Sequence, residues 1–460
     1  MDRAFVDYYR CPANLVTFAH SGELTSGDCG YFCFGSNAIG YGRCSSNFPG
    51  EHSADMLHDA LADVMVERGR VWLPFDPSEV VANLRYERYA AWNGDGKRLG
   101  TSSILRKAYY SVRPLLPVSV RKHLQRMHLR DWREIRFPNW PVDSNVECIF
   151  EQLMTLLLEA HAVDSVPFIW FWPDGLPSSA IMTHDVEALP GREACSRLMD
   201  LDDAWGIKSS FEIVPEGKYP VPEAFLKDIR HRGFEINVHD LDHDGRLFSN
   251  RELFLERATE INRYGRDYGA AGFRSAVLYR NVDWFEALDF AYDMSVPSVA
   301  NLEAQGGGCC SITPFFIGKI LELPVTTTQD YCLLHILNQS SIALWKRQIA
   351  LITDQHGLAS FIVHPDYVFE PRALDTYKAL LAYLAGLRSE GKLWIARPRE
   401  VNDWWRERSQ MRLVRRGHAW EIEGPGKERA RIAYASLEGN QLVYRVESPS
   451  LAVANTVNAA

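Results

Sequence analysis

The sequence predicts an α/β protein whose largest part is a distorted (β/α) barrel, and two observations between residues 166 and 408 support this. Apolar runs rich in β-branched and aromatic residues alternate with segments of helical periodicity. Several of these helical segments are followed closely by Gly, the usual stop signal of a helix. Because consecutive parallel strands need a crossover connection, the alternation favours a parallel sheet covered by helices.

Eight runs are expected to be strands and four segments are expected to be helices. The expected strands are 180–182, 209–214, 234–238, 271–273, 292–296, 320–324, 359–363 and 393–396. The expected helices are 221–232, 251–264, 342–355 and 372–387. Eight strands is the number that a (β/α) barrel requires.

Three further regions flank the predicted barrel. Residues 1–100 are rich in Gly, Ser, Cys and aromatic residues, which predicts an N-terminal α+β domain of unknown role. Residues 101–165 are expected to be a basic helical linker. Residues 409–460 contain alternating runs separated by Gly and Pro, which indicates a small β module and a tail.

Within the linker, residues 105–136 carry nine Lys and Arg residues against two acids, interleaved with apolar side chains. A basic amphipathic segment of this kind can make peripheral contact with an anionic membrane. The other interpretation, which we prefer, is a solvated segment whose apolar side packs on the next domain. Pro114 and Pro117 exclude one continuous helix.

Composition narrows the class of partner and the compartment. The 460-residue chain has a net charge of −9, which argues against nucleic acid as a main partner and leaves the oligomeric state undetermined. The first fifteen residues lack the apolar core of a secretory signal, and nine cysteines show no disulfide framework. We therefore expect a cytoplasmic protein without membrane spans. Cys29, Cys33 and Cys44 lack the spacing of a zinc site, so no second metal is expected.

Charged and imidazole side chains follow four of the expected strands. They are Asp185 with Glu187, His239 with His243, Arg274, and His364. The loops after the carboxyl ends of strands carry the chemistry of such barrels. The sequence therefore predicts that these distant segments meet in one site, with the residue types needed for metal-assisted hydrolysis.

The spacing of these residues suggests separate roles. Asp185 and Glu187 flank one residue at a strand end, so both face the same side, and one can bind a metal while the other accepts a proton. The alternative is that Asp185 caps the following helix. His239 and His243 stand four residues apart, which we interpret as one side of a helical turn offering two metal ligands. The alternative is two histidines on a polar surface loop.

The remaining two residues are expected to work through partners. Arg274 lies at a strand end where an unpaired guanidinium would be costly, so it is expected to pair with Asp185. His364 is expected to act as a general acid tuned by a nearby carboxylate. For both residues a purely structural role is the alternative.

At these positions, over residues 168–405, the chain resembles the polysaccharide deacetylase family, also called the NodB homology domain or carbohydrate esterase family 4. The family motif TFDDG is matched in part by residues 183–187, and the motif H-[ST]-x-x-H by the spacing of His239 and His243. Phe273-Arg274-Ser275 and Ile362-Val363-His364 resemble the third and fifth motifs. Leu323-Pro324-Val325 resembles the fourth motif, and the position of its acid stays open among Glu322, Gln329 and Asp330.

The resemblance implies a barrel of the NodB type and a division of roles among these residues. Glu187, His239 and His243 would hold a divalent ion, zinc or alternatively cobalt. Asp185, oriented by Arg274, would be the base, and His364 the acid. Val186 occupies the position of a metal-binding aspartate in the family, so that role passes to Glu187.

The implied reaction is removal of an N-acetyl group from an amino sugar in an intracellular glycan, nucleotide-linked or lipid-linked precursor. Two alternatives stay open. One is an amide hydrolase acting on a non-sugar substrate. The other is a glycan-binding protein whose site has lost its activity.

Overall fold

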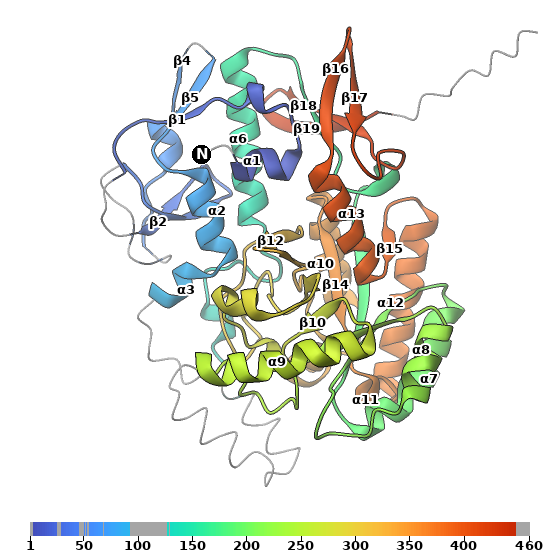
Figure 1. The fold of residues 1–460 in the computed structure, drawn as a ribbon. Helices are drawn as coiled ribbons and strands as arrows, with labels where there is room; N and C mark the ends of the chain where they lie inside the picture. Colours follow the sequence, from blue (N-terminus) through green and yellow to red (C-terminus); the bar gives the residue numbers. More distant parts are fainter. Residues whose placement is uncertain are drawn as a thin grey trace, which may run out of the picture.

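A computed structural model describes residues 3–24, 29–45, 50, 52, 55–67, 69–92, 127 and 129–447 of the chain. A strongly curved sheet lies at the centre, with helices around it (Figure 1). The N-terminal elements lie on the opposite side of this sheet from α7, α8 and α12 (Figure 1).

Nine strands form the central sheet in the order β12-β13-β11-β10-β9-β8-β7-β14, with β15 also paired to β7. They are β7 (Ser179–Val186), β8 (Ser210–Ile213), β9 (Glu235–His239), β10 (Gly272–Arg274), β11 (Tyr292–Asp293), β12 (Phe315–Ile317), β13 (Ile320–Glu322), β14 (Leu358–Ile362) and β15 (Trp394–Ala396). Every pairing is parallel except that of β12 with β13. All eight expected strands are present, and the predicted α/β fold class is confirmed.

Side chains join the two ends of this curved sheet. The hydroxyls of Thr326 and Thr327 donate to the backbone oxygens of Leu358 and Ser360, each at 2.6 Å. The Ser360 amide donates back to Thr326 Oγ1 at 2.9 Å. Because the segment after β13 reaches β14 through threonine side chains, the barrel is distorted there.

Helices cover the outer face of the sheet. They are α7 (Leu189–Ala204), α8 (Glu223–His231), α9 (Arg251–Tyr268), α10 (Ala343–Asp354), α11 (Pro365–Val368), α12 (Pro371–Ser389) and α13 (Pro398–Gln410). The four expected helices are among them. The sequence analysis did not predict α7, whose second residue is Pro190, and proline is favoured in the first turn of a helix.

Gly265 did not end α9 as expected. The helix continues to Tyr268 and ends at Gly269, which has a φ of 57°. A Cβ atom at Gly265 would lie 2.8 Å from the Phe290 ring, so this glycine allows close packing inside the helix.

The N-terminal region packs directly on the barrel. It contains α1 (Arg3–Tyr9), β1 (Phe18–His20), β2 (Gly30–Cys33), β3 (Ile39–Gly42), β4 (Met65–Glu67), β5 (Arg70–Leu73), α2 (Pro77–Arg85) and α3 (Arg88–Trp92). One cluster of buried side chains includes Phe5 and Leu84 from this region together with Tyr292 and Leu321 from the barrel.

Residues 145–161 are not part of a linker, contrary to the expectation for 101–165. They form α6 (Asn145–His161), and ten of its residues are buried, including Ile149, Leu153 and Leu157. The helix belongs to the shared core because it contacts both β5 of the N-terminal region and β18 (Ile432–Glu438) near the C-terminus. Residues 105–126, which hold most of the basic segment proposed to touch a membrane, lie outside the described residues.

The C-terminal module consists of β16 (Arg412–Arg416), β17 (Ala419–Glu423), β18 (Ile432–Glu438) and β19 (Gln441–Val446). β6 (Val166–Ile169) pairs with β18, so the first residues assigned to the barrel join the C-terminal sheet. The remaining domain boundaries stay predictions.

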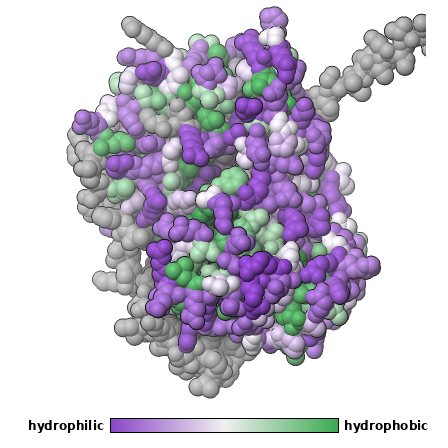
Figure 2. Space-filling view, in the orientation of Figure 1, coloured by the Kyte–Doolittle hydropathy of each residue, from purple (hydrophilic) through white to green (hydrophobic). Residues whose placement is uncertain are grey.

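The face of the molecule shown in Figure 2 is mostly hydrophilic, with small apolar areas between polar side chains. None of the helices in the described part of the chain combines the length and the apolar character that a membrane crossing needs.

Candidate metal centre and active site

Four strands deliver the predicted site residues to the same edge of the sheet. Asp185 is the penultimate residue of β7 and Glu187 follows the strand. His239 ends β9, Arg274 ends β10, and His364 follows β14 by two residues. The carboxyl ends of parallel strands meet at one edge, which is why residues separated by about 180 positions come together.

The two acids of β7 face one side of the strand and the intervening valine faces the other. Asp185 is 4% exposed and Val186 is fully buried in the core. Asp185 does not cap α7, because the residue before that helix is Ala188 and no side chain caps it. The alternative interpretation of Asp185 as a helix cap is therefore wrong.

His239 ends a strand and His243 lies on the loop that follows, so the predicted helical turn is wrong. His239 is the last residue of β9, while Asp240 and His243 have φ angles of 57° and 53°. These two left-handed residues turn the loop back, and the imidazole ring centroids are 4.9 Å apart. Both rings are buried, so they are not a pair of surface histidines.

Glu187 is the centre around which three imidazoles gather. Its Oε1 lies 2.9 Å from His243 Nε2, 3.8 Å from His239 Nε2 and 3.5 Å from His364 Nε2. His239 Nε2 also lies 3.8 Å from Asp185 Oδ2. Two sets of donor atoms each fall within 4.8 Å of one another: Glu187, His239 and His243, and Asp185, Glu187 and His364.

These distances fit a small divalent cation. Ligand bonds of about 2.0–2.2 Å in tetrahedral geometry place ligand atoms roughly 3.4 Å apart. The Nε2 atoms of His239 and His243 are buried, and neither meets the geometry of a hydrogen bond within the described part of the chain. Buried polar atoms are normally satisfied, so two convergent nitrogens beside a carboxylate match the ligand set of zinc or cobalt.

The backbone fixes the ring orientation of His239. Its Nδ1 lies 3.2 Å from the carbonyl oxygen of Arg274, which can only accept a hydrogen bond. Nδ1 therefore carries the proton in the neutral ring, and Nε2 offers its lone pair to the site. The neighbouring acids play no part in this: Asp242 and Asp244 both accept hydrogen bonds from Arg257.

Arg274 holds Asp185, as expected. Its Nη1 donates to Asp185 Oδ1 and to the Thr183 hydroxyl, each at 2.6 Å, and its Nε donates to the carbonyl of Met294 at 3.0 Å. Burial would raise the pKa of Asp185, but the charges of Arg274, His239 and His364 outweigh burial and leave that pKa below its ordinary value. Asp185 is thus an ionised carboxylate at neutral pH.

His364 is gripped by Asp330, the partner that the sequence left unidentified. His364 Nδ1 lies 2.6 Å from Asp330 Oδ1, and the His364 amide donates to Oδ2 at 2.8 Å. Burial alone would lower the pKa of His364, but Asp330 and Glu187 raise it well above its ordinary value. His364 therefore holds a proton at neutral pH and can donate it.

Burial would likewise raise the pKa of Glu187, yet this pKa lies well below its ordinary value. The charge of His243 is the largest opposing influence, and the other two imidazoles add to it. A carboxylate that stays ionised in a buried position is a suitable metal ligand.

Aromatic side chains form a wall next to His364. The Tyr367 ring lies 5.1 Å from the His364 ring, and Tyr331 and His335 lie 5.8 Å and 5.4 Å from Tyr367. These three side chains are only partly buried. The sequence analysis missed them because they lie on two segments with no recognisable motif.

No protein-family model matches this sequence, and no curated protein matches it. Solved structures with a similar arrangement include a protein named as a polysaccharide deacetylase from Mycobacterium smegmatis, 17% identical, with a TM-score of 0.42, covering 52% of this chain and 93% of that one. A protein named as a polysaccharide deacetylase from Pseudomonas aeruginosa PAO1 is 14% identical, with a TM-score of 0.40 and coverage of 51% and 92%.

Puue allantoinase is 13% identical, with a TM-score of 0.39 and coverage of 51% and 92%. These overlaps extend over half of the present chain and over nearly all of each solved chain.

Proposed function

We propose that the chain is a metal-dependent hydrolase that removes the N-acetyl group from an amino sugar. One observation carries the proposal. Glu187, His239 and His243 converge on one point, and Asp185 Oδ2 and His364 Nε2 lie 3.8 Å and 3.5 Å from His239 Nε2 and Glu187 Oε1. A base, a cation site and an acid within a few ångströms are the parts required for amide hydrolysis.

A divalent ion held by Glu187, His239 and His243 would supply Lewis acidity toward water and the amide carbonyl. Asp185 is the general base, and Arg274 keeps it ionised and fixed in orientation. His364 donates its proton to the leaving nitrogen, and Asp330 holds the ring in place for that step. The products are acetate and a free amine.

The aromatic wall beside His364 favours a sugar as the substrate. Tyr331, His335 and Tyr367 present partly exposed rings close to the acid that would protonate the leaving amine. Rings of this kind combine an apolar face with a polar edge, which suits a pyranose. We infer that the substrate is an N-acetylated sugar in an intracellular glycan, nucleotide-linked or lipid-linked precursor; the cytoplasmic location stays a prediction from the sequence.

The test is release of acetate from N-acetylhexosamine conjugates in the presence of zinc or cobalt. Asp185→Asn keeps the shape of the side chain and removes its basicity, so activity should fall by about 10²–10⁴-fold. Metal content should stay close to that of the wild type, whereas the melting temperature should fall because the buried Arg274 loses its charged partner. An Asp185→Asn variant with full activity would contradict the proposed base.

The same assay separates the alternatives. Hydrolysis of small non-sugar amides without any reaction on sugar acetamides would favour an amide hydrolase of another class. A purified chain that binds neither zinc nor cobalt would favour the inactive glycan-binding protein.

A further inference from the structure

A buried ion pair joins the N-terminal region to the barrel, and the proposed chemistry does not use it. Arg280 lies on the loop after β10 with a fully buried side chain, and the Glu87 side chain is 9% exposed. Arg280 Nε donates to Glu87 Oε2 at 2.6 Å, and Nη2 donates to Oε1 of the same carboxylate. Such a two-pronged pair fixes both position and orientation.

The same carboxylate also holds the segment 298–310. The Gly308 amide donates to Glu87 Oε1 at 2.6 Å, and Arg280 Nη2 donates to the carbonyl of Gly306 at 3.3 Å. Two residues along the N-terminal chain, the Tyr89 hydroxyl donates to the carbonyl of Gly308 at 2.6 Å. The N-terminal region therefore holds this barrel segment through hydrogen bonds to Gly308.

The backbone conformations of Glu87 and of the glycines that it contacts are unusual and allow this close approach. Glu87 follows α2 with a φ of 55°, a conformation in which glycine is the ordinary residue after a helix. Gly307 and Gly308 have φ angles of 101° and 142°, and a Cβ atom at Gly307 would lie 2.7 Å from Glu87 Oε1. A charged residue kept in a strained conformation indicates that its side chain is needed there.

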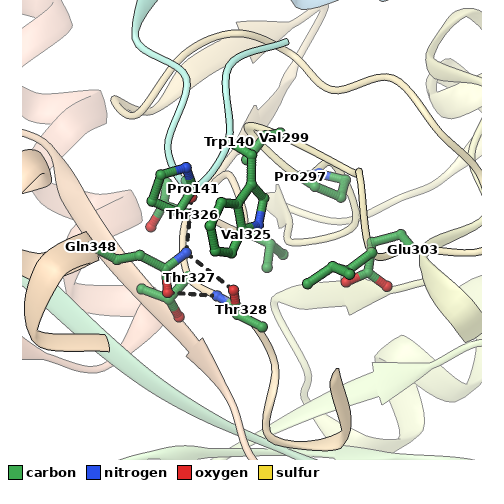
Figure 3. A pocket seen from close by; sticks show the side chains of 11 residues that line it. Trp140, Pro141, Pro297, Val299, Glu303, Val325, Thr326, Thr327, Thr328 and Gln348 are labelled. Atoms are coloured by element: carbon green, nitrogen blue, oxygen red, sulfur yellow. Dashed lines mark hydrogen bonds between the residues drawn. The ribbon is translucent and has the colours of Figure 1, made fainter. Parts of the chain in front are cut away.

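The gripped segment forms one wall of a pocket (Figure 3). Val299, Leu302 and Glu303 of this segment line the pocket together with Trp140 and Thr328. Figure 3 shows Glu303 on the side of the pocket opposite Gln348. Thr328 lies two residues before Asp330, the partner of His364, so this side of the pocket is connected through the chain to the proposed active site.

A hydrogen bond ties this wall to the proposed acid. Gln329, the neighbour of Asp330, donates from Nε2 to Glu303 Oε2 at 2.6 Å. Charged groups on both sides also act on the Glu303 carboxyl. Burial raises its pKa, while the hydrogen bond from Gln329 and the charges of Arg280 and His364 oppose that rise. Glu303 is thus hydrogen-bonded to the residue next to Asp330 and is influenced by the charges of both Arg280 and His364.

We propose that Glu87 is a positioning residue, which through Arg280 and Gly308 sets the place of segment 298–310. With it Glu87 sets the pocket wall whose Glu303 is hydrogen-bonded to Gln329, the neighbour of Asp330. The N-terminal region then completes the substrate-binding face of the barrel. The kinetic consequence rests on the proposed deacetylase function, whereas the structural consequence does not.

The experiment compares Glu87→Ala with Glu79→Ala in the full chain. Glu79 forms a similar pair with Arg43, at 3.0 Å from Nε to both carboxylate oxygens, within the N-terminal region. Glu87→Ala should speed amide hydrogen exchange in segment 298–310 by about tenfold or more. It should raise KM for the sugar acetamide about fivefold to tenfold and leave kcat within about twofold. Glu79→Ala should do neither.

A second variant separates positioning from folding. In Glu87→Ala/Arg280→Met no buried charge is left unpaired, so thermal stability should recover. Exchange in 298–310 should stay fast and KM should stay high, because the anchor of Gly308 is still missing. Recovery of KM together with stability would overturn the proposal, and so would unchanged exchange in Glu87→Ala. If no variant or wild-type protein releases acetate, the proposed function fails and the exchange result alone decides the role of Glu87.

Discussion

The two ends of β9 show why burial by itself does not identify a functional residue. Glu235 begins this strand and His239 ends it, and both are buried. The Glu235 carboxylate accepts hydrogen bonds from the Tyr292 hydroxyl and from the Arg399 amide. His239 Nε2 has no hydrogen bond within the described part of the chain. The carboxylate at the start of the strand is hydrogen-bonded, whereas the imidazole Nε2 at its end has no hydrogen-bond partner among the described residues.

The pKa shifts of Glu235 and His239 also differ in their causes. Burial raises the pKa of Glu235 to about 7, with Tyr292 and Arg399 opposing that rise. Burial lowers the pKa of His239, but the carboxylates of Asp185 and Glu187 raise it above its ordinary value. An imidazole pressed by two carboxylates attracts a proton or a metal cation, and these compete for the same nitrogen.

Removing the proposed metal ligand His239 should have the largest effect on activity. His239→Gln should abolish stable metal binding and lower kcat/KM by about a thousandfold or more, since the cation contributes several kcal/mol to the transition state. Metal content by mass spectrometry and acetate release measure the two consequences. Glu235→Gln, on the same strand, should keep both its metal and its activity. Equal metal content in the two variants would contradict the assignment of His239 as a metal ligand.

Weakening the acid should have an intermediate effect. Asp330 raises the pKa of His364, so Asp330→Asn lowers that pKa and His364 loses its proton at a lower pH. Activity that needs protonated His364 should therefore decline earlier as the pH rises, and kcat at neutral pH should fall about tenfold to a hundredfold. The pH profile of kcat is the measurement. An alkaline limb that does not move would exclude Asp330 as the group that tunes the acid.

Replacing Glu235, at the start of the strand, should change only the pH dependence of stability. A buried carboxyl whose pKa is raised to about 7 is protonated in the folded state at a pH where the unfolded chain has already lost its proton. Its stabilising contribution is complete below about pH 4.5 and is lost as the pH rises toward 7, by about 2–3 kcal/mol. Glu235→Gln should flatten this part of the stability profile in urea unfolding at pH 5 and pH 8. A slope equal to that of the wild type would show that Glu235 does not cause it.

The fold class and the six proposed site residues could be read from the sequence because both depend on local pattern. Alternating apolar runs and helical periods specify strands and helices, and a parallel sheet brings every strand end to one edge. Asp185, His239, Arg274 and His364 each lie at such an end, so their meeting needed no further information.

The pairing of Arg274 with Asp185 was predicted, but only the tertiary structure decided the partner of His364 and the course of the loop from His239 to His243. Asp330 reaches His364 across 34 positions from a segment after β13, and nothing in its own sequence context sets it apart from nearby acids. The loop that brings His243 back to His239 depends on two left-handed residues, which a spacing of four does not reveal. The contact between Glu87 and Arg280 spans 193 positions. Strand ends are fixed by backbone hydrogen bonding, whereas these contacts depend on how distant loops pack, and their energies appear only after the chain has folded.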